Sequence, residues 1–521
     1  MVDKHTKGFG QYFTPPEIVN FMISLIEKGK TASVFEPCAG EGAFLKGLSE
    51  KGFTDITAYE IDKDLKNRSK IKIDYKNTLL ERPTRKFNII IGNPPYVRWK
   101  NIAPDTRDKL KNDVYWKEKI NGLNDLLYLF ILLALDSLEK GGELIFITPT
   151  FWTSTLHSKL IRKKLLENGE ITHFINFEEA KVFNSVASNI LIFRFVKDKL
   201  GKQMKVIKVL KKGKINENDL HEITKALNNL KRGKHIKSDW YEAYLHKQFN
   251  TSDPWNLLPP EIEPIINKIE ENADSRLGDI ANICNGMVSG LDRAFVIYDK
   301  EELSEKEKSF LIKVIKAKDL DCYFPLTFTN YIFLNDKVRT EKELEKLPHI
   351  ASKLLPFKKD LQDRYNYNKD IPWWYWTFLR NREAIIKNKI KIVVPSKERY
   401  DSRNCVRFGL VIGDYYITQD VSAIIKKPEI KEDIKYLLAI LNSDTIFLWL
   451  RYKGLTRGGV LEFSEKPLSI IPIKRINWEN ATEVKIYKKI IQITQNILER
   501  KNYTDNKDKL EGLIKTLYGI N

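Results

Sequence analysis

The chain contains 521 residues, which is too many for one hydrophobic core, so we expect two or three domains. Hydrophobic residues make up 42% of the sequence and charged residues 30%, a balance typical of a soluble globular protein. The net charge of +19 favours a polyanionic partner such as nucleic acid, although a genome biased towards lysine would give a similar excess.

The first two hundred residues alternate between helical and strand patterns. The spacing of apolar residues predicts helices at residues 17–27, 125–138 and 158–166. Short apolar runs predict strands at residues 33–35, 56–62, 88–92, 143–149, 174–177 and 189–195. This alternation predicts an α/β fold with a doubly wound, Rossmann-like sheet. The polar residues 98–121 are expected to form a mobile loop near the substrate.

A glycine turn follows the first of these strands. Gly40 and Gly42 are one residue apart, at the first strand-to-helix turn, where open parallel sheets bind nucleotides. The third glycine of a dinucleotide site is missing, and Glu36 and Glu41 flank the turn. Carboxylates repel a pyrophosphate but attract a cation, which favours the sulfonium and ammonium groups of S-adenosylmethionine. A tight turn without any ligand also explains the two glycines.

Two later positions strengthen this interpretation. Glu60 ends the second strand about twenty residues beyond the turn, the usual place for a carboxylate that accepts ribose hydroxyls. The strand at residues 88–92 ends in Asn93-Pro94-Pro95-Tyr96. Two prolines form a rigid corner without N–H donors, which presents an amide, a bare carbonyl and an aromatic ring. That set suits a planar nitrogen base with an exocyclic amine.

With these motifs in this order, the sequence resembles the gamma-class, TaqI-like N6-adenine DNA methyltransferases of restriction-modification systems. In that class a Thr-Pro-Pro segment comes first, here within residues 11–19, and a target-recognition domain comes last. The resemblance covers essentially the whole chain, although only the first two hundred residues have specific motifs. It implies a methyltransferase catalytic domain followed by a mixed α+β recognition domain.

The resemblance also implies roles for individual residues. Cofactor contacts are implied for Thr14, Glu36, Cys38, Gly40, Glu60 and Pro95. Contacts with the target adenine are implied for Asn93, Pro94 and Tyr96, and Phe183 matches an aromatic that packs against the flipped base. From the residues alone, a core position is the favoured interpretation of Phe183, and the resemblance shifts the preference to stacking on the base. Where the family usually has an Asp that reaches the cofactor's adenine, this chain has Asn77, with Asp74 nearby.

The second half of the chain has a different composition. Residues 197–214 contain eight lysines and face almost no acids, which indicates a phosphate-contacting connector or a solvated surface. We expect the catalytic domain at 1–253, the recognition domain at 254–475 and closing helices at 476–521. The aromatic run at residues 373–376, beside Arg380 and Arg382, fits a core or a nucleic-acid contact equally well. Residues 451–459 form a glycine-rich basic segment that phosphates could approach.

Cysteine spacing and hydropathy exclude further classes of protein. The four cysteines are scattered, without the spacing of a disulfide framework or a zinc site, which predicts no metal and suits a reducing cytoplasm. The longest apolar run, residues 126–135, is about ten residues long, against the roughly twenty that span a bilayer. The first residues show no signal peptide, and we expect a cytoplasmic protein without membrane association.

The resemblance therefore implies a site-specific DNA adenine-N6 methyltransferase that uses S-adenosylmethionine, double-stranded DNA and a flipped adenine. A separately encoded restriction endonuclease is a compatible partner. Two other functions remain open. An enzyme that methylates a protein glutamine amide or an RNA base amine could use a similar Asn-Pro-Pro-Tyr corner, although such enzymes are usually shorter. The second open function is that of a DNA-binding specificity subunit whose catalytic half is degenerate. The intact motifs argue against it.

Overall fold

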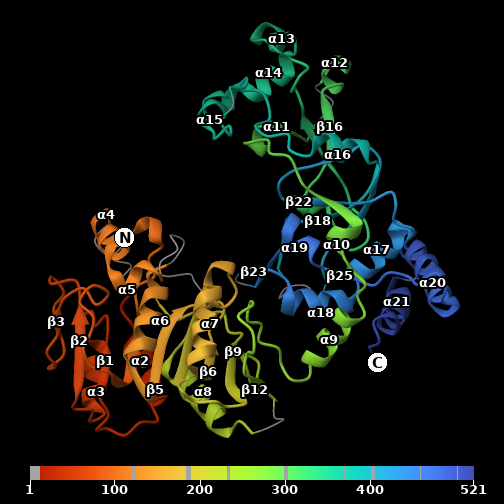
Figure 1. Cartoon of the computed structure of the whole chain (residues 1–521). Coiled ribbons are helices and arrows are strands. Elements are labelled where there is room, and N and C mark those ends of the chain that lie inside the picture. Colours follow the sequence, from red (N-terminus) through yellow and green to blue (C-terminus); the bar gives the residue numbers. More distant parts are fainter. Residues whose placement is uncertain are drawn as a thin grey trace. The chain divides into compact units, whose positions relative to one another are not determined.

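The computed structural model describes residues 12–119, 125–183, 189–231, 235–298, 303–368, 370–399, 405–457, 459–501 and 503–520. The chain divides into two compact units, residues 1–263 and 264–521 (Figure 1). The first unit contains the alternating helices and strands, and the second contains smaller sheets and further helices. The domain boundary expected at residue 253 lies before this division, and residues 476–521 belong to the second unit.

A sheet of ten strands forms the centre of the first unit, in the order β11-β12-β9-β6-β8-β5-β4-β1-β2-β3. Strands β3, β2, β1, β4 and β5 are parallel neighbours, whereas β8 runs antiparallel between β5 and β6. The strands are β1 (Val34–Glu36), β2 (Ile56–Glu60), β3 (Asp74–Tyr75), β4 (Phe87–Gly92), β5 (Leu138–Pro149), β6 (Gly169–Asn176), β8 (Ile190–Lys197), β9 (Gln203–Val209), β11 (His235–Lys237) and β12 (Tyr241–Lys247). A separate pair is formed by β7 (Ala180–Lys181) and β10 (Gly213–Lys214).

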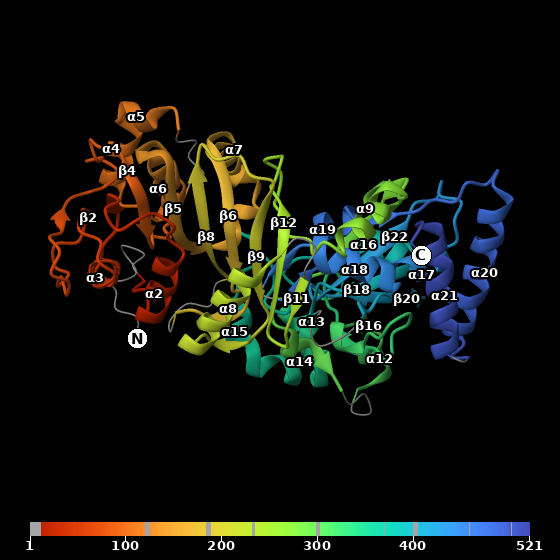
Figure 2. The ribbon, with the colours of Figure 1, turned by 90° about the horizontal axis from the view of Figure 1, so that it is seen from below.

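Helices cover both faces of this sheet (Figure 2). They are α2 (Pro16–Ser24), α3 (Ala43–Glu50) and α8 (Glu217–Asn229) on one face, and α6 (Leu126–Ser137) and α7 (Lys159–Asn168) on the other. Successive strand residues point to opposite faces, so Val34 packs with α2, α3 and α8 while Phe35 packs with α6 and α7. Burial of both faces is typical of parallel sheets and explains the near-continuous apolar runs. The predicted doubly wound α/β fold is confirmed.

Local sequence explains how several of these helices begin. Pro16 is the first residue of α2, where a missing N–H costs nothing. The Asp125 side chain accepts a hydrogen bond from the N–H of Leu127 at 3.1 Å and caps α6. Helix α6 has 12 residues, nearly all buried. Among the helices that the structure describes, none is long and apolar enough to cross a membrane.

The segment after the Pro-Pro corner is not the loop that we expected. It forms the short helices η1 (Trp99–Asn101), α4 (Pro104–Asn112) and α5 (Val114–Lys117). Trp99, Leu110 and Trp116 are buried in the core on the α6 side of the sheet. These apolar side chains are too few and too widely spaced to appear as a helical pattern in a polar sequence, which is why the prediction was wrong. The end of the expected loop, residues 120–121, lies outside the described residues.

The lysine-rich residues 197–214 are also better paired with acids than the sequence indicated. Strand β9 lies within the sheet, beside β6 and β12. Lys199 lies 3.1 Å from Glu170, and Lys211 lies 2.6 Å from Asp219. These acids come from the start of β6 and from α8, so only the fold reveals the pairing. The pairs reduce the positive charge available to phosphates at these positions.

The second unit is built from several small sheets and a group of helices at its C-terminal end. Its larger sheets have the orders β14-β22-β18-β20 and β15-β17-β16-β21. The strands are β13 (Ser275–Arg276), β14 (Ala281–Asn285), β15 (Val296–Ile297), β16 (Leu311–Ile315), β17 (Thr329–Ile332), β18 (Ile390–Pro395), β19 (Lys397–Arg399), β20 (Gly409–Ile412), β21 (Tyr415–Ile417), β22 (Val421–Lys426), β23 (Thr456–Arg457), β24 (Val460–Glu462) and β25 (Pro472–Ile473). The mixed α+β content expected for this half is present.

Helices of the second unit surround these sheets. They are α9 (Glu263–Glu271), which begins at the division, α10 (Leu277–Ile280), α11 (Asp292–Phe295), α12 (Glu305–Lys308), α13 (Glu341–Glu345), α14 (Pro348–Leu354), α15 (Lys358–Asp363), α16 (Arg382–Lys387), α17 (Ile434–Leu441), α18 (Asp444–Lys453), α19 (Glu465–Ser469), α20 (Ala481–Leu498) and α21 (Tyr503–Leu517). The predicted closing helices correspond to α20 and α21, which pack against each other. Residues 451–453 belong to α18, and Gly458 of the predicted glycine-rich segment lies outside the described residues.

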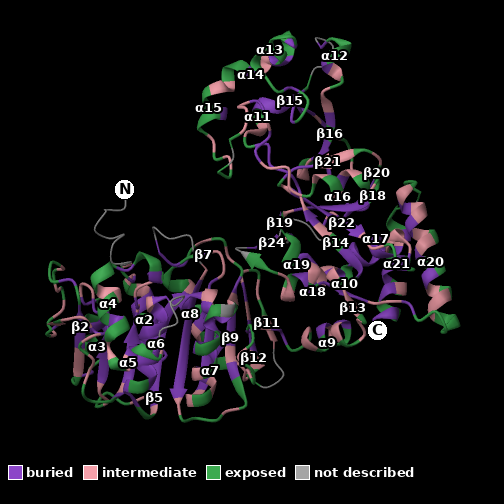
Figure 3. Ribbon diagram, turned by 45° about the horizontal axis from the view of Figure 1, so that its top comes forward, coloured by how far each residue is buried: buried purple, intermediate pink, exposed green. Residues whose placement is uncertain are grey.

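The aromatic run at residues 373–376 belongs mainly to the core. Trp374 and Trp376 are 5% and 1% exposed, and their indole N–H groups donate to the carbonyls of Val338 and Ile332. Buried residues also follow the strands of the second unit, such as β18 and β22 (Figure 3). Arg382 is paired with Asp336 at 3.0 Å. Of the two interpretations left open by the sequence, the structure therefore favours the packing role for these two tryptophans.

A buried ion pair links two central strands of the first unit. The Arg194 guanidinium, on β8, lies 3.0 Å from the Glu143 carboxylate on β5, and both side chains are 2% exposed. Arg194 also donates to the hydroxyl of Thr172 on β6 at 2.8 Å. The second Glu143 oxygen accepts from the N–H of Glu27 at 3.1 Å, close to the end of α2. The pair therefore ties three neighbouring strands to the segment that follows α2.

We predict that Arg194→Met lowers the free energy of unfolding by about 3–5 kcal/mol, because it leaves a buried carboxylate without its partner. Urea denaturation of the purified protein measures this. Lys163→Ala is the control, since this exposed side chain forms only a surface pair, 3.7 Å from Glu167, and the expected change is below about 0.5 kcal/mol. Adding Glu143→Leu to Arg194→Met should restore most of the stability. A single variant as stable as the wild type would contradict the assignment.

Candidate active site

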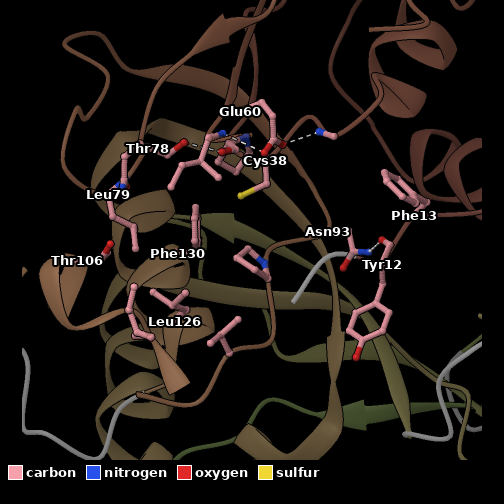
Figure 4. Close-up of a pocket in the computed structure, with 18 residues that line it drawn as sticks. Tyr12, Phe13, Cys38, Glu60, Thr78, Leu79, Asn93, Thr106, Leu126 and Phe130 are labelled. Atoms are coloured by element: carbon pink, nitrogen blue, oxygen red, sulfur yellow. Dashed lines mark hydrogen bonds between the residues drawn. The ribbon is translucent and has the colours of Figure 1, made fainter. Parts of the chain in front are cut away.

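A pocket lies where the carboxyl ends of β1, β2 and β4 meet (Figure 4). Strand β1 lies between the other two, which makes this the switch point where open α/β sheets bind ligands. The lining residues are Tyr12, Phe13, Pro37, Cys38, Gly40, Glu60, Ile61, Asn77, Thr78, Leu79, Asn93, Pro95, Val97, Ile102, Ala103, Thr106, Leu126 and Phe130. Six of the predicted site residues are among them: Cys38, Gly40, Glu60, Asn77, Asn93 and Pro95.

The glycine turn holds the Glu60 carboxylate at one end of the pocket. Gly40 adopts a positive φ of 53°, a conformation that glycine tolerates best, and its N–H donates to Glu60 Oε2 at 2.7 Å. The other oxygen accepts from the N–H groups of Ile61 and Asp62. Burial is the main cause that raises the pKa of Glu60. Each carboxylate oxygen can accept two hydrogen bonds, so Oε2 retains capacity for a ligand hydroxyl.

Glu36 is the most unusual group near the pocket. It is the last residue of β1 and is 1% exposed, and its Oε2 has no hydrogen-bond partner among the described residues. Burial, and secondly the neighbouring Glu60, hold its pKa well above the ordinary range. A buried acceptor without a donor is costly, and a cationic amine would relieve that cost. Glu36 does not itself line the pocket, whereas the adjacent Pro37 and Cys38 do.

One amide and several apolar side chains also line the pocket. The Asn77 side chain lines it, and its Oδ1 accepts from the N–H of Leu79 at 3.1 Å. The hydroxyl of Thr78 donates to the Pro37 carbonyl at 2.6 Å and ties this segment to the glycine turn. Figure 4 shows Leu126 and Phe130 away from Glu60 and Thr78. Asp74, the alternative to Asn77, is paired with Lys72 at 2.9 Å and does not line the pocket.

Sequence reasoning missed the wall that η1 and α4 contribute. Ile102, Ala103 and Thr106 line the pocket from this segment. The segment is held in place by Trp116, whose indole N–H donates to the Leu79 carbonyl at 2.7 Å. An ion pair between Arg82 and Asp113 at 3.0 Å adds a second attachment. The only signal in the sequence was the presence of two tryptophans in a polar stretch.

At the Pro-Pro corner, hydrogen bonds fix the Asn93 amide. Its Nδ2 donates to the Tyr12 carbonyl at 2.8 Å and to the Thr14 hydroxyl at 3.2 Å. Both partners are acceptors here, so the amide nitrogen must face them and Oδ1 must point the other way. The Tyr96 hydroxyl lies within reach of Asn93 Oδ1 and of the Ile147 carbonyl. Burial, and secondly Tyr12, keep the pKa of Tyr96 well above its ordinary value, so this phenol remains a donor.

The remaining predicted residues lie around this corner. Thr14 is buried and contacts Asn93, and it is not among the residues that line the pocket. Pro94 is buried, and Phe183 is 4% exposed within the core on the α2 side of the sheet. The loop after Phe183 that the sequence singled out, residues 184–186, lies outside the described residues. Within the described part of the chain, no cluster of three or more His, Cys, Asp or Glu could hold a metal ion.

Comparison with known proteins identifies relatives of this chain. Residues 35–183 match the family described as Eco57I restriction-modification methylase. The chain is 38% identical to the Type II methyltransferase M.HindII of Haemophilus influenzae over 513 residues, covering 95% of each chain. It is 37% identical to M.HincII, also of Haemophilus influenzae, over 497 residues, again covering 95% of each.

Among solved structures, the Type IIL restriction-modification enzyme MmeI has the same fold. It aligns with a TM-score of 0.59 at 12% identity, covering 97% of this chain and 72% of that enzyme. The alignments with the two Haemophilus enzymes extend over nearly the whole chain and include both units. The chain therefore belongs to the family of Type II restriction-modification methyltransferases.

Proposed function

We propose that the protein transfers a methyl group from S-adenosylmethionine to the N6 amine of an adenine flipped out of duplex DNA. The orientation of Asn93 is the observation that supports this most strongly. Its Oδ1 points away from Tyr12 and Thr14 and can accept a hydrogen from an amine. Neither Pro94 nor Pro95 has an N–H, so the backbone of these two residues brings no donor to the corner. The Tyr96 hydroxyl can donate to Asn93 Oδ1, and the second lone pair of that oxygen stays available for an amine hydrogen. Cytosine N4 has a similar amine, and the family resemblance favours adenine.

The chemistry follows from the properties of the aromatic amine. The lone pair of adenine N6 is delocalised into the ring, which makes the amine a poor nucleophile. Acceptance of its two hydrogens by Asn93 Oδ1 and the Pro94 carbonyl would localise that pair towards the methyl donor. Holding the two reactants in line supplies much of the remaining acceleration. The rings of Tyr96 and Phe183 would replace the stacking that the base loses on leaving the duplex.

The pocket fits S-adenosylmethionine, which supplies an electrophilic methyl group when bound. Glu60 is placed to accept hydrogen bonds from ribose hydroxyls, and Asn77 from the exocyclic amine of the cofactor's adenine. The unpartnered Glu36 oxygen suits the positively charged amino acid part of the cofactor. Leu126, Phe130 and Ile102 would pack against the adenine ring. Thr14 accepts a hydrogen bond from Asn93, and its contact with the cofactor, which the family resemblance implied, stays a prediction.

We further propose that the second unit recognises the DNA sequence, and that the division at residue 263 separates recognition from catalysis. The net charge of +19 suits a polyanion. The structure of MmeI, whose fold extends over both units, was determined in complex with DNA. M.HindII and M.HincII are Type II methyltransferases, and we propose a separately encoded restriction endonuclease as a partner of this chain as well. Modification in the cytoplasm, where the chromosome lies, follows from this role.

Asn93→Ala should lower kcat for methyl transfer by about 10²- to 10³-fold or more, because it removes the acceptor that orients the amine. The measurement is transfer of labelled methyl groups to DNA, with N6-methyladenine identified by mass spectrometry of the nucleosides. Asn112→Ala, on the exposed end of α4, is the matched control and should behave as the wild type. Substantial methylation by purified, folded Asn93→Ala would overturn the assigned role.

Glu60→Ala should raise the Kd for S-adenosylmethionine by about 10- to 100-fold, since hydrogen bonds to a charged acceptor are among the stronger ones. Isothermal titration calorimetry measures this without DNA. The control is Glu50→Ala, whose side chain is 62% exposed at the end of α3. If Glu60→Ala bound the cofactor as tightly as the control, the pocket would not be the cofactor site.

A further inference from the structure

Three aromatic rings meet beside Asn93. The ring of Tyr12 stacks on that of Tyr96, with centroids 5.8 Å apart and planes inclined by 25°. The same Tyr12 ring lies 6.2 Å from the ring of Phe183, inclined by 40°. Both distances are within the range of attractive aromatic pairs. Tyr12 therefore contacts both rings that we propose to face the flipped base, and this second inference rests on that proposal.

The Tyr12 ring and a base cannot use the same surface together. A stacked base needs its plane about 3.4 Å from the Tyr96 ring, as bases have in DNA, and the Tyr12 ring already packs there. The backbone of Tyr12 is also committed, because its carbonyl accepts from Asn93 Nδ2 at 2.8 Å. Any exchange therefore requires the Tyr12 side chain to rotate to another rotamer while its carbonyl stays in place.

Little besides packing holds the Tyr12 ring in this position. Its side chain is only partly buried, and within the described part of the chain its hydroxyl has no hydrogen-bond partner. By contrast, the Tyr96 hydroxyl has two possible acceptors, and Phe183 is buried in the core. Of the three rings, Tyr12 is the one that is neither held by a hydroxyl hydrogen bond among the described residues nor buried in the core.

We infer that Tyr12 is an additional residue of the target-base site, whose ring occupies the place of the flipped adenine in the DNA-free protein and is displaced when the base enters. Base entry is then an exchange of one aromatic ring for another on the face of Tyr96. The Tyr12 carbonyl continues to orient Asn93 throughout this exchange. A planar base is the ligand class that can replace a phenol ring in such a position.

The test compares side-chain variants that leave the Tyr12 carbonyl intact. Tyr12→Leu keeps most of the packing volume but cannot stack, so duplex DNA containing the target site should bind about 2- to 10-fold more tightly, the factor that corresponds to one aromatic pair. Fluorescence of 2-aminopurine placed at the target position should brighten more than with the wild type. Tyr12→Phe restores the ring and should return both measurements to wild-type values.

The matched control is Tyr75→Leu, a tyrosine of similar kind that is 37% exposed on β3, away from the three rings. It should leave DNA affinity at the wild-type value. Weaker binding and a dimmer signal with Tyr12→Leu would overturn the inference, because Tyr12 would then be a wall that the bound base needs. An unchanged affinity and signal would overturn it as well.

Failure of this inference can be separated from failure of the proposed function. If the wild type forms N6-methyladenine but Tyr12→Leu binds no tighter, only the exchange is wrong. If the wild type forms no N6-methyladenine, adenine is not the target and both are wrong. If Tyr12→Leu lowers the melting temperature, Tyr12→Ile and Tyr12→Met are tested in the same two measurements. All three variants must bind the DNA more tightly than Tyr12→Phe does.

Discussion

The position of β1 between β2 and β4 is the constraint on which the site depends. Chain connections leave these strands towards opposite faces of the sheet, so a crevice opens at their carboxyl ends. The same edge receives Glu36, Glu60 and Asn93, each at or just after the end of its strand. A sheet buried on both faces keeps these ends in fixed register, and the buried pair between Arg194 and Glu143 ties the neighbouring strands together.

Much of the first unit could be predicted because its signals are local. Continuous apolar runs such as that of β4 identify buried parallel strands, and glycine, proline and acidic residues at their ends identify the site. Cys38, Gly40, Glu60, Asn77 and Pro95, for which the family resemblance implied cofactor contacts, all line one pocket. Their contacts with cofactor and substrate are still proposals, since they depend on ligands.

The features that escaped prediction depend on contacts between distant parts of the sequence. Trp99 and Trp116 bury a segment whose composition is typical of a loop, because each finds a place in a core formed by other elements. Lys199 and Lys211 find acids that come from β6 and α8. Tyr12 is another case, since nothing in its neighbourhood indicates that its ring reaches Tyr96 and Phe183. Packing between distant segments decides the roles of these residues, and the spacing of residues along the chain does not reveal such packing.

The bonds made by the Asn93 amide explain why an acid would be a poor replacement at this position. A carboxylate is the better acceptor for an amine hydrogen, so chemistry alone would favour Asp. However, Asp has no N–H to give to the Tyr12 carbonyl and the Thr14 hydroxyl, and its second oxygen would face the lone pairs of that carbonyl. Asp at position 93 would thus be the stronger acceptor, whereas Asn is the residue whose amide N–H groups fix the direction of the acceptor oxygen. In this chain the direction of the acceptor therefore matters as much as its strength.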